Sequence, residues 1–215
     1  DGVAEGAGPG KVLVDMSTTQ PDRSREMAQR LRAATGMGWV DAPVSGGPAG
    51  AAAGSMAMMV GGDAAALERA TPILQHLTAR LWHIGPSGAG QVAKLVNNLL
   101  VASHLVTAGE ALRLGAAAGV APEALLPVLN GASGRSAVTE VNWPRWIIPG
   151  TFDSGFSAGL MRKDVGLALE LARELDVPLE ATGRAALLWQ ELREAVPDEA
   201  DFNHLSAAIL AGAKP

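Results

Sequence analysis

The sequence feature that most constrains the fold is the stretch from Gly85 to Gly115, which is apolar on nearly every side. Ala, Leu and Val dominate it, and a glycine-rich turn precedes it. The stretch therefore predicts a long helix that begins near Gly88–Gly90 and is buried all round. Three polar side chains interrupt the apolar surface at spacings of three and four, which places them on one helix face. They are Gln91, Lys94 and Asn98.

Lys94 admits two interpretations, because a buried ammonium costs free energy unless it is paired or hydrogen-bonded. In the first, its side chain extends to solvent from a core helix. In the second, it is a catalytic lysine in a cleft. Asn97 and Asn98 follow Lys94 in the sequence, and a glycine-rich turn precedes it. That combination favours the catalytic interpretation.

The composition excludes several kinds of chemistry. The 215 residues include no cysteine and no tyrosine, which rules out disulfides, thiol nucleophiles, Cys-ligated zinc and a tyrosine acid. The net charge is -5 and no Lys/Arg run exceeds two residues, so neither nucleic acid nor an anionic membrane is an expected partner. The apolar run Leu99–Ala108 is too short to span a bilayer. The histidines lack metal-ligand spacing, so no metal site is predicted. The absence of cysteine leaves the compartment open, although a reducing cytoplasm fits best.

Strands alternate with helices as far as Ile84, and every periodic segment beyond it is helical. The expected strands are Lys11–Ser17, Trp39–Val44, Ser55–Val60 and Arg80–Ile84. The helices expected between them are Asp22–Ala34 and Ala64–Leu77, the second capped by Asp63. After the long helix we expect Glu123–Leu129, a weaker segment Ser136–Trp146 broken by Pro144, Leu160–Leu175, Gly183–Ala195 and a last helix capped by Asp201 or Asn203. The pattern predicts two domains, residues 1–87 and 88–215.

Two glycine-rich motifs each admit a ligand-binding and a purely structural interpretation. Gly88–Ala93 (GAGQVA) matches a loose dinucleotide fingerprint, but no second strand ending in an acid follows it, so a helix-start turn is the better interpretation. Ser45-Gly46-Gly47-Pro48 follows a strand, where α/β proteins place their ligand-binding loops. Its N–H groups and the Ser45 hydroxyl suit a carboxylate. A tight turn that needs glycine for conformation alone is equally compatible with it.

Two features of the C-terminal half have ordinary structural interpretations. Lys163-Asp164 matches a solvated charge pair on a helix, which is the usual state of such pairs. Phe156 follows Ser154-Gly155 and matches a core anchor.

Five motifs follow one another in order and cover essentially the whole chain. They are VDMST at Val14–Thr18, DAPVSGGPAGA at Asp41–Ala51, MVGGD at Met59–Asp63, GAGQVAKLVNNLL at Gly88–Leu100 and GFSAGLMRKD at Gly155–Asp164. Together they resemble the β-hydroxyacid dehydrogenase family. Its members include 3-hydroxyisobutyrate dehydrogenase, tartronate semialdehyde reductase and the glyoxylate/succinic semialdehyde reductases.

The resemblance implies a fold, a cofactor and a set of site residues. The fold is an α/β partial Rossmann-like domain followed by an all-α domain similar to the C-terminal part of 6-phosphogluconate dehydrogenase, with a long interdomain helix. The cofactor is NAD or NADP, and the partners are a small hydroxy acid or aldehyde acid and further copies in a homodimer or higher oligomer. The implied site residues are Lys94 as catalyst, Ser45, Gly46, Gly47, Asn98, Phe156 and Asp164 for the substrate, and Thr18 and Lys163 for the cofactor.

Related families fit less well. The 6-phosphogluconate dehydrogenases typically have His where Asn97 stands, and imine reductases replace the lysine found at Lys94. Short-chain dehydrogenases need the missing tyrosine. The compact region after Ser136 tilts the prediction toward the small-aldehyde-acid reductases.

The sequence thus predicts an oxidoreductase that interconverts a small β-hydroxy acid and its semialdehyde. Lys94 would donate a proton in reduction and accept one in oxidation, and burial would lower its pKa toward a useful range. The alternative is a non-catalytic binding or assembly module on the same scaffold, or an inactive fragment. Members of the family begin with a GxGxxG turn that these 215 residues lack. On that basis the chain alone is expected to bind NAD(P) weakly and to be inactive.

Overall fold

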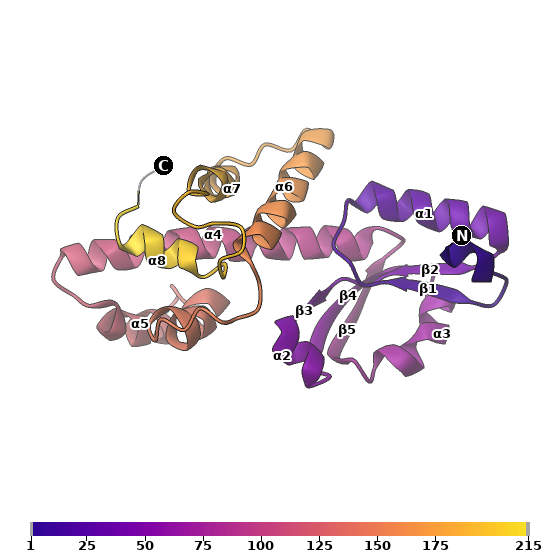
Figure 1. Cartoon of the computed structure of the whole chain (residues 1–215), viewed down its shortest axis with the longest axis horizontal. Coiled ribbons are helices and arrows are strands. Elements are labelled where there is room, and N and C mark those ends of the chain that lie inside the picture. Colours follow the sequence, from indigo (N-terminus) through magenta and orange to yellow (C-terminus); the bar gives the residue numbers. More distant parts are fainter. Residues whose placement is uncertain (1, 214–215) are drawn as a thin grey trace. The chain divides into compact units, whose positions relative to one another are not determined.

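The computed structural model describes residues 2–213, and the chain forms two compact units. Unit 1 is Asp1–Val96 and unit 2 is Asn97–Pro215. Unit 1 contains the whole sheet, and unit 2 is built from helices. The predicted fold class, a partial Rossmann-like domain followed by an all-α domain, is therefore confirmed (Figure 1). The division at residues 87/88 stays a prediction.

Unit 1 is organised around a five-stranded mixed sheet in the order β1-β2-β4-β3, with β5 paired to β4. Its strands are β1 (Val12–Asp15), β2 (Gly38–Asp41), β3 (Val44–Ser45), β4 (Met56–Gly62) and β5 (Thr78–Gly85). Strands β1 and β2 are parallel, β4 is antiparallel to both β2 and β3, and β5 is parallel to β4. The carboxyl ends of β1 and β2 therefore lie side by side.

Two helices cover opposite sides of β1 and β2, namely α1 (Pro21–Thr35) and α3 (Ala64–Leu74) (Figure 1). Asp63 caps α3 as predicted, since its side chain accepts hydrogen bonds from the N–H groups of Ala65 and Ala66. Apolar side chains of α3 pack on the sheet in one core cluster, which contains Val40, Ala42, Met58, Val60, Ala66, Leu67, Ala70 and Leu74. Residues Val3–Gly6 form a short 3₁₀ helix, η1.

The predicted strand Trp39–Val44 is two strands rather than one, because β2 ends at Asp41 and β3 begins at Val44. Pro43 has no N–H to contribute to a ladder, which explains the break. After β3 the chain forms a short helix, α2 (Gly47–Ala52), where the sequence predicted only a glycine turn. Proline in its first turn suits such a start, since the first N–H groups of a helix have no helical acceptor.

Unit 2 is assembled along α4 (Ala89–Ala117), the long helix that the sequence predicted, which begins in unit 1. The prediction that it is buried all round is wrong, because its apolar residues Val96, Leu100 and Leu114 are exposed. The other helices are α5 (Pro122–Gly131), the π-helix η2 (Val138–Ile147), α6 (Ala158–Glu174), α7 (Ala181–Glu191) and α8 (His204–Leu210). Trp189 Nε1 donates to the carbonyl of Ala102 at 3.2 Å, and Ser206 Oγ donates to that of Leu105 at 2.7 Å. Helices α7 and α8 are thereby tied directly to the α4 backbone. No helix in residues 2–213 is long and apolar enough to cross a membrane.

The segment predicted to break at Pro144 continues through it as a π-helix. The Ile148 N–H bonds to the Trp143 carbonyl, five residues back, at 2.9 Å. Proline lacks an N–H and crowds the carbonyl four residues before it, so a wider turn accommodates it without ending the helix. Trp143 is fully buried in this segment.

Arg162 on α6 is a buried cation whose guanidinium hydrogen-bonds three acceptors within unit 2. Its Nε donates to the Trp189 carbonyl at 2.6 Å, one terminal nitrogen donates to the Val196 carbonyl at 2.5 Å, and the other to Asp198 Oδ1 at 2.5 Å. Arg193 pairs with the second oxygen of Asp198 at 2.7 Å, but its side chain is 54% exposed against 2% for Arg162. The segment after α7 is therefore held by one buried guanidinium.

Replacing Arg162 by Met should lower the free energy of unfolding of unit 2 by about 3 kcal/mol, because the buried acceptors lose their donor. Replacing Arg193 by Met, which touches the same carboxylate from the surface, should cost less than about 1 kcal/mol. Urea denaturation followed by tryptophan fluorescence measures both. Equal losses in the two variants would contradict this account.

Candidate active site

The start of α4 is fixed by the carboxylate of Asp41, the last residue of β2. Asp41 is fully buried, its Oδ1 accepts the N–H of Gly88 at 2.8 Å, and its Oδ2 accepts the N–H of Gln91 at 3.3 Å. The first N–H groups of a helix lack helical acceptors, and a negative charge there is favoured by the helix dipole. One side chain of the sheet therefore holds the helix that carries Lys94 at the carboxyl end of β2.

Glycines make this approach of helix and sheet possible. A Cβ on Gly61 would lie 2.6 Å from Asp41 Oδ2, and a Cβ on Gly90 would lie 2.5 Å from the Met59 carbonyl. Both distances are too short for a real side chain. The GAGQVA sequence is thus a helix start packed against β2 and β4, as predicted, and helices rather than a second strand follow it.

The side chain of Gln91 joins the same helix to the end of β1. It is fully buried, its Nε2 donates to the Ser17 carbonyl at 2.9 Å, and its Oε1 accepts the Thr19 N–H at 3.1 Å. Asp15 Oδ1 holds the turn from the other side, because it accepts the Ser17 N–H at 3.0 Å and the Ser17 hydroxyl at 2.6 Å. Thr18 lies half-buried between these anchors, at the edge of the sheet where α/β folds place ligands.

Lys94 and Asn98 follow Gln91 on α4 at spacings of three and seven, so all three share a helix face. Lys94 is 7% exposed and Asn98 is 5% exposed, which does not match a lysine extended into solvent. In unit 1, Gln91 therefore connects the turn that contains Thr18 to the helix that carries Lys94.

Ser45 ends β3, as expected for a residue of a ligand-binding loop, and two glycines follow it. Gly46 has φ 130° and Gly47 has φ 62°. Both values lie in the region that favours glycine over residues with a Cβ. The loop conformation thus depends on glycine, and its capacity to hold a carboxylate stays a prediction.

In unit 2 the predicted substrate residues Asn98 and Asp164 are direct partners. Asn98 Nδ2 donates to Asp164 Oδ2 at 2.5 Å, and Asn97 Nδ2 donates to Asn98 Oδ1 at 3.0 Å. Lys163 Nζ lies 3.1 Å from Asp164 Oδ1, within ion-pair distance but not aligned as a hydrogen bond. Both ends of the Asn98 amide are therefore oriented by neighbours.

The prediction that Lys163-Asp164 is a solvated pair is wrong for Asp164. Its side chain is 3% exposed, whereas that of Lys163 is 45% exposed. Asp164 occupies the side of α6 that carries its buried residues, and Lys163 occupies the next position around the helix.

Phe156 precedes α6 and is half-buried. Its ring contacts that of Phe202 edge to face, with centroids 5.3 Å apart, and its carbonyl accepts the Phe202 N–H at 2.9 Å. These contacts match the predicted core anchor, and its role toward a substrate stays a prediction. Among residues 2–213 no group of His, Asp and Glu side chains is arranged to hold a metal ion.

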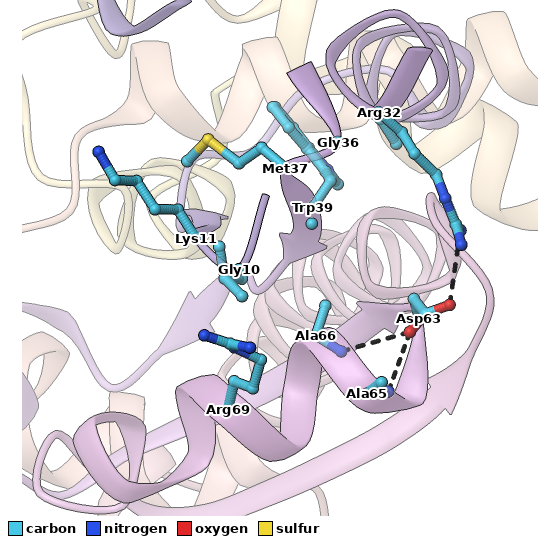
Figure 2. Close-up of a pocket in the computed structure, with 13 residues that line it drawn as sticks. Gly10, Lys11, Arg32, Gly36, Met37, Trp39, Asp63, Ala65, Ala66 and Arg69 are labelled. Atoms are coloured by element: carbon cyan, nitrogen blue, oxygen red, sulfur yellow. Dashed lines mark hydrogen bonds and ion pairs between the residues drawn. The ribbon is translucent and has the colours of Figure 1, made fainter. Parts of the chain in front are cut away.

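A cavity of about 210 Å³ lies in unit 1 at the amino ends of β1 and β2, between α1 and α3 (Figure 2). Its charged lining residues are Lys11, Arg32, Asp63 and Arg69. Asp63 caps α3 and lies 3.6 Å from Arg32. Dashed lines in Figure 2 mark these contacts. Among residues 2–213, none of the predicted site residues lines this cavity. Thr18 and Asp41 lie at the opposite, carboxyl ends of the same strands.

Sequence reasoning gave no role to two residues on which this geometry depends, Asp41 and Gln91. Gln91 belonged to the polar face of the long helix, but its partners are 72 and 74 residues away in the chain. For Asp41 the available signal was an acid that ends an apolar strand and lies two residues before a proline.

The fold and this arrangement define a class, the nicotinamide-dependent dehydrogenases in which a Rossmann-like domain is followed by an all-helical domain. Residues 1–85 match the family described as the NAD binding domain of 6-phosphogluconate dehydrogenase. Residues 88–209 match the family described as NAD-binding of NADP-dependent 3-hydroxyisobutyrate dehydrogenase. The chain belongs to the β-hydroxyacid dehydrogenase family, whose cofactor is NAD or NADP.

Individual relatives agree with this assignment. The chain is 40% identical to 2-(hydroxymethyl)glutarate dehydrogenase from Eubacterium barkeri, covering 88% of this chain and 62% of the relative. It is 38% identical to the NAD-dependent L-serine dehydrogenase of Pseudomonas aeruginosa, covering 94% and 70%. The solved structure of Mycobacterium tuberculosis 3-hydroxyisobutyrate dehydrogenase with L-serine has a TM-score of 0.88 at 33% identity, covering 96% and 72%. The chain spans about two thirds of the length of these relatives.

Replacing Asp41 by Asn should lower the free energy of unfolding of unit 1 by about 1–3 kcal/mol, because one N–H at the start of α4 loses a charged acceptor. Asp22→Asn is the matched control, since Asp22 lies in the first turn of α1 but its side chain is 71% exposed. It should change stability by less than about 0.5 kcal/mol. Thermal unfolding of both variants measures the difference, and an unchanged Asp41→Asn protein would disprove the anchoring role.

Proposed function

We propose that this chain forms part of an oxidoreductase that interconverts a small β-hydroxy acid and its semialdehyde, with Lys94 as general acid and base. The observation that carries the proposal is a buried lysine on a helix that Asp41 and Gln91 tie to the carboxyl ends of β1 and β2. NAD or NADP supplies or accepts the hydride when it is bound. Thr18 and Lys163 fit its nicotinamide end, since Thr18 lies at the ligand edge of the sheet and the Lys163 side chain is half-exposed.

Each remaining residue has a part in this proposal. In reduction the Lys94 ammonium donates a proton to the carbonyl oxygen, and in oxidation neutral Lys94 accepts the hydroxyl proton. The loop of Ser45, Gly46 and Gly47 holds the substrate carboxylate through N–H groups and a hydroxyl. Asn98 hydrogen-bonds the reacting oxygen.

Asp164 and Phe156 complete the substrate side of the proposal. Asp164 acts through Asn98, because its Oδ2 already accepts the Asn98 amide and fixes its orientation. Phe156 supplies an apolar wall, in keeping with its half-buried ring.

The names of the relatives suggest a substrate class. Serine, 3-hydroxyisobutyrate and 2-(hydroxymethyl)glutarate each carry a primary alcohol on the carbon next to the one that bears the carboxylate. We assign this chain a substrate with the same HOCH₂–C–COO⁻ unit. Its oxidation moves one hydride to NAD(P)⁺ and one proton to Lys94, and leaves an aldehyde.

A non-catalytic binding or assembly module is the alternative function. It is disfavoured by the position of Lys94, since a binding module gives no reason for a lysine that is 7% exposed on the same helix face as Gln91 and Asn98. We also propose that the enzyme is cytoplasmic and forms a homodimer or higher oligomer through unit 2. Exposed apolar side chains of unit 2 support this, among them Leu114, Val128 and Leu175.

Replacing Lys94 by Ala, in a protein that carries the whole nucleotide-binding domain, should lower kcat by about 10²–10⁴-fold, because proton transfer loses its catalyst. Lys11→Ala, which removes an exposed lysine from the amino end of β1, is the control and should keep parental activity. Steady-state turnover of a β-hydroxy acid measures both. Activity of Lys94→Ala within a few-fold of the parent would remove Lys94 from the role proposed for it.

Replacing Ser45 by Ala should raise KM for the acid about three- to tenfold and leave cofactor affinity unchanged, because one hydrogen bond to the carboxylate is lost. Ser55→Ala, ten residues further on before β4, is the control. Initial rates over a grid of both substrates separate the two effects. A change confined to the cofactor would show that the loop serves another ligand.

A further inference from the structure

We propose that Gln91 is a positioning residue that sets the distance between Thr18 and Lys94, and through it the distance between the nicotinamide and the proton donor. The inference rests on the proposed function, in which Thr18 lies beside the nicotinamide and Lys94 transfers the proton. Gln91 itself touches neither cofactor nor substrate in this account.

The Gln91 side chain holds the backbone on both sides of Thr18 with one planar group. Its amide donates to the carbonyl of Ser17 and accepts the N–H of Thr19. An amide with both ends engaged has little rotational freedom. Two hydrogen bonds, at 2.9 and 3.1 Å, therefore restrain the position of Thr18 relative to α4.

These two hydrogen bonds lie where the sheet no longer supplies partners. The last bond from β1 toward the β2 segment joins the Asp15 carbonyl to the Ala42 N–H at 2.7 Å. Asp15 also holds Ser17, but both residues belong to the same turn, so this contact does not reach α4. Gln91 thus provides a side-chain connection between this strand end and the helix that carries Lys94.

Gln91 and Lys94 belong to one rigid element. Lys94 comes three residues after Gln91 in an unbroken α-helix, on the same face, and Asp41 fixes the Gln91 N–H at the start of that helix. A displacement of the Thr18 turn relative to Gln91 is then a displacement relative to Lys94. Hydride transfer is sensitive to such errors, since a misplacement of about 1 Å can cost about 100-fold in rate.

The test uses Gln91→Met, which keeps the length of the side chain and removes both hydrogen bonds, in a protein with the whole nucleotide-binding domain. Ser103→Ala is the matched control, because Ser103 is a buried polar residue of the same helix whose hydroxyl bonds only within α4. Two quantities are measured: amide hydrogen exchange at Thr19 by NMR, and the single-turnover rate of hydride transfer by stopped-flow absorbance. Lys94→Ala is assayed in parallel.

We expect Gln91→Met to speed exchange at Thr19 by about fivefold or more. Hydride transfer should slow by about 10- to 100-fold, with KM for the acid and Kd for the cofactor within about twofold of the parent. Faster exchange with parental hydride transfer would overturn the inference and leave Gln91 a purely structural residue. Unchanged exchange would overturn it as well, since the two Gln91 hydrogen bonds would then not hold the Thr18 turn. Parental activity in Lys94→Ala would instead refute the proposed function, which separates the two failures.

Discussion

The arrangement of unit 1 depends on one buried interaction, the carboxylate of Asp41 at the start of α4. It satisfies two N–H groups that the helix cannot satisfy itself, and it does so from the last residue of a sheet strand. Gly61 and Gly90 are required beside it, because a Cβ at either position would collide with the sheet or the helix start. The direction of α4, and hence the position of Lys94, depends on this contact. Packing alone would not fix the first turn of the helix at a particular residue of the sheet in this way.

Local patterns in the sequence were enough to predict the elements that depend on neighbouring residues. The apolar surface of Gly85–Gly115 predicted α4, and Asp63 predicted the cap of α3. The sequence did not predict how the chain behaves at Pro43 and Pro144. Pro43 splits a strand, and Pro144 lies within a π-helix instead of ending a helix. In each case the outcome depends on how the backbone on either side packs in the fold, and local residue propensities do not describe that packing.

In the candidate site, too, local spacing predicted some features, whereas others depend on contacts between distant residues. Helical spacing placed Gln91, Lys94 and Asn98 on one face, but the partners of the Gln91 side chain and the acceptor of Asn98 Nδ2 come from more than 60 residues away. Asp164 is the instructive error, because a charged pair on a helix is usually solvated, whereas here its carboxylate is buried against an amide. Lys163 was assigned a role by resemblance to a family and by no feature of its own. Contacts across such separations are set by the fold.

The central claim is that Lys94 transfers the proton, and the pH dependence of hydride transfer in both directions tests it most directly. Reduction needs the ammonium, so its rate should fall as pH rises through the pKa of Lys94. Oxidation needs the neutral amine, so its rate should rise over the same interval. We expect opposite limbs in the two directions, and the loss of both limbs in Lys94→Ala. Limbs that run in the same direction, or that persist without Lys94, would contradict it.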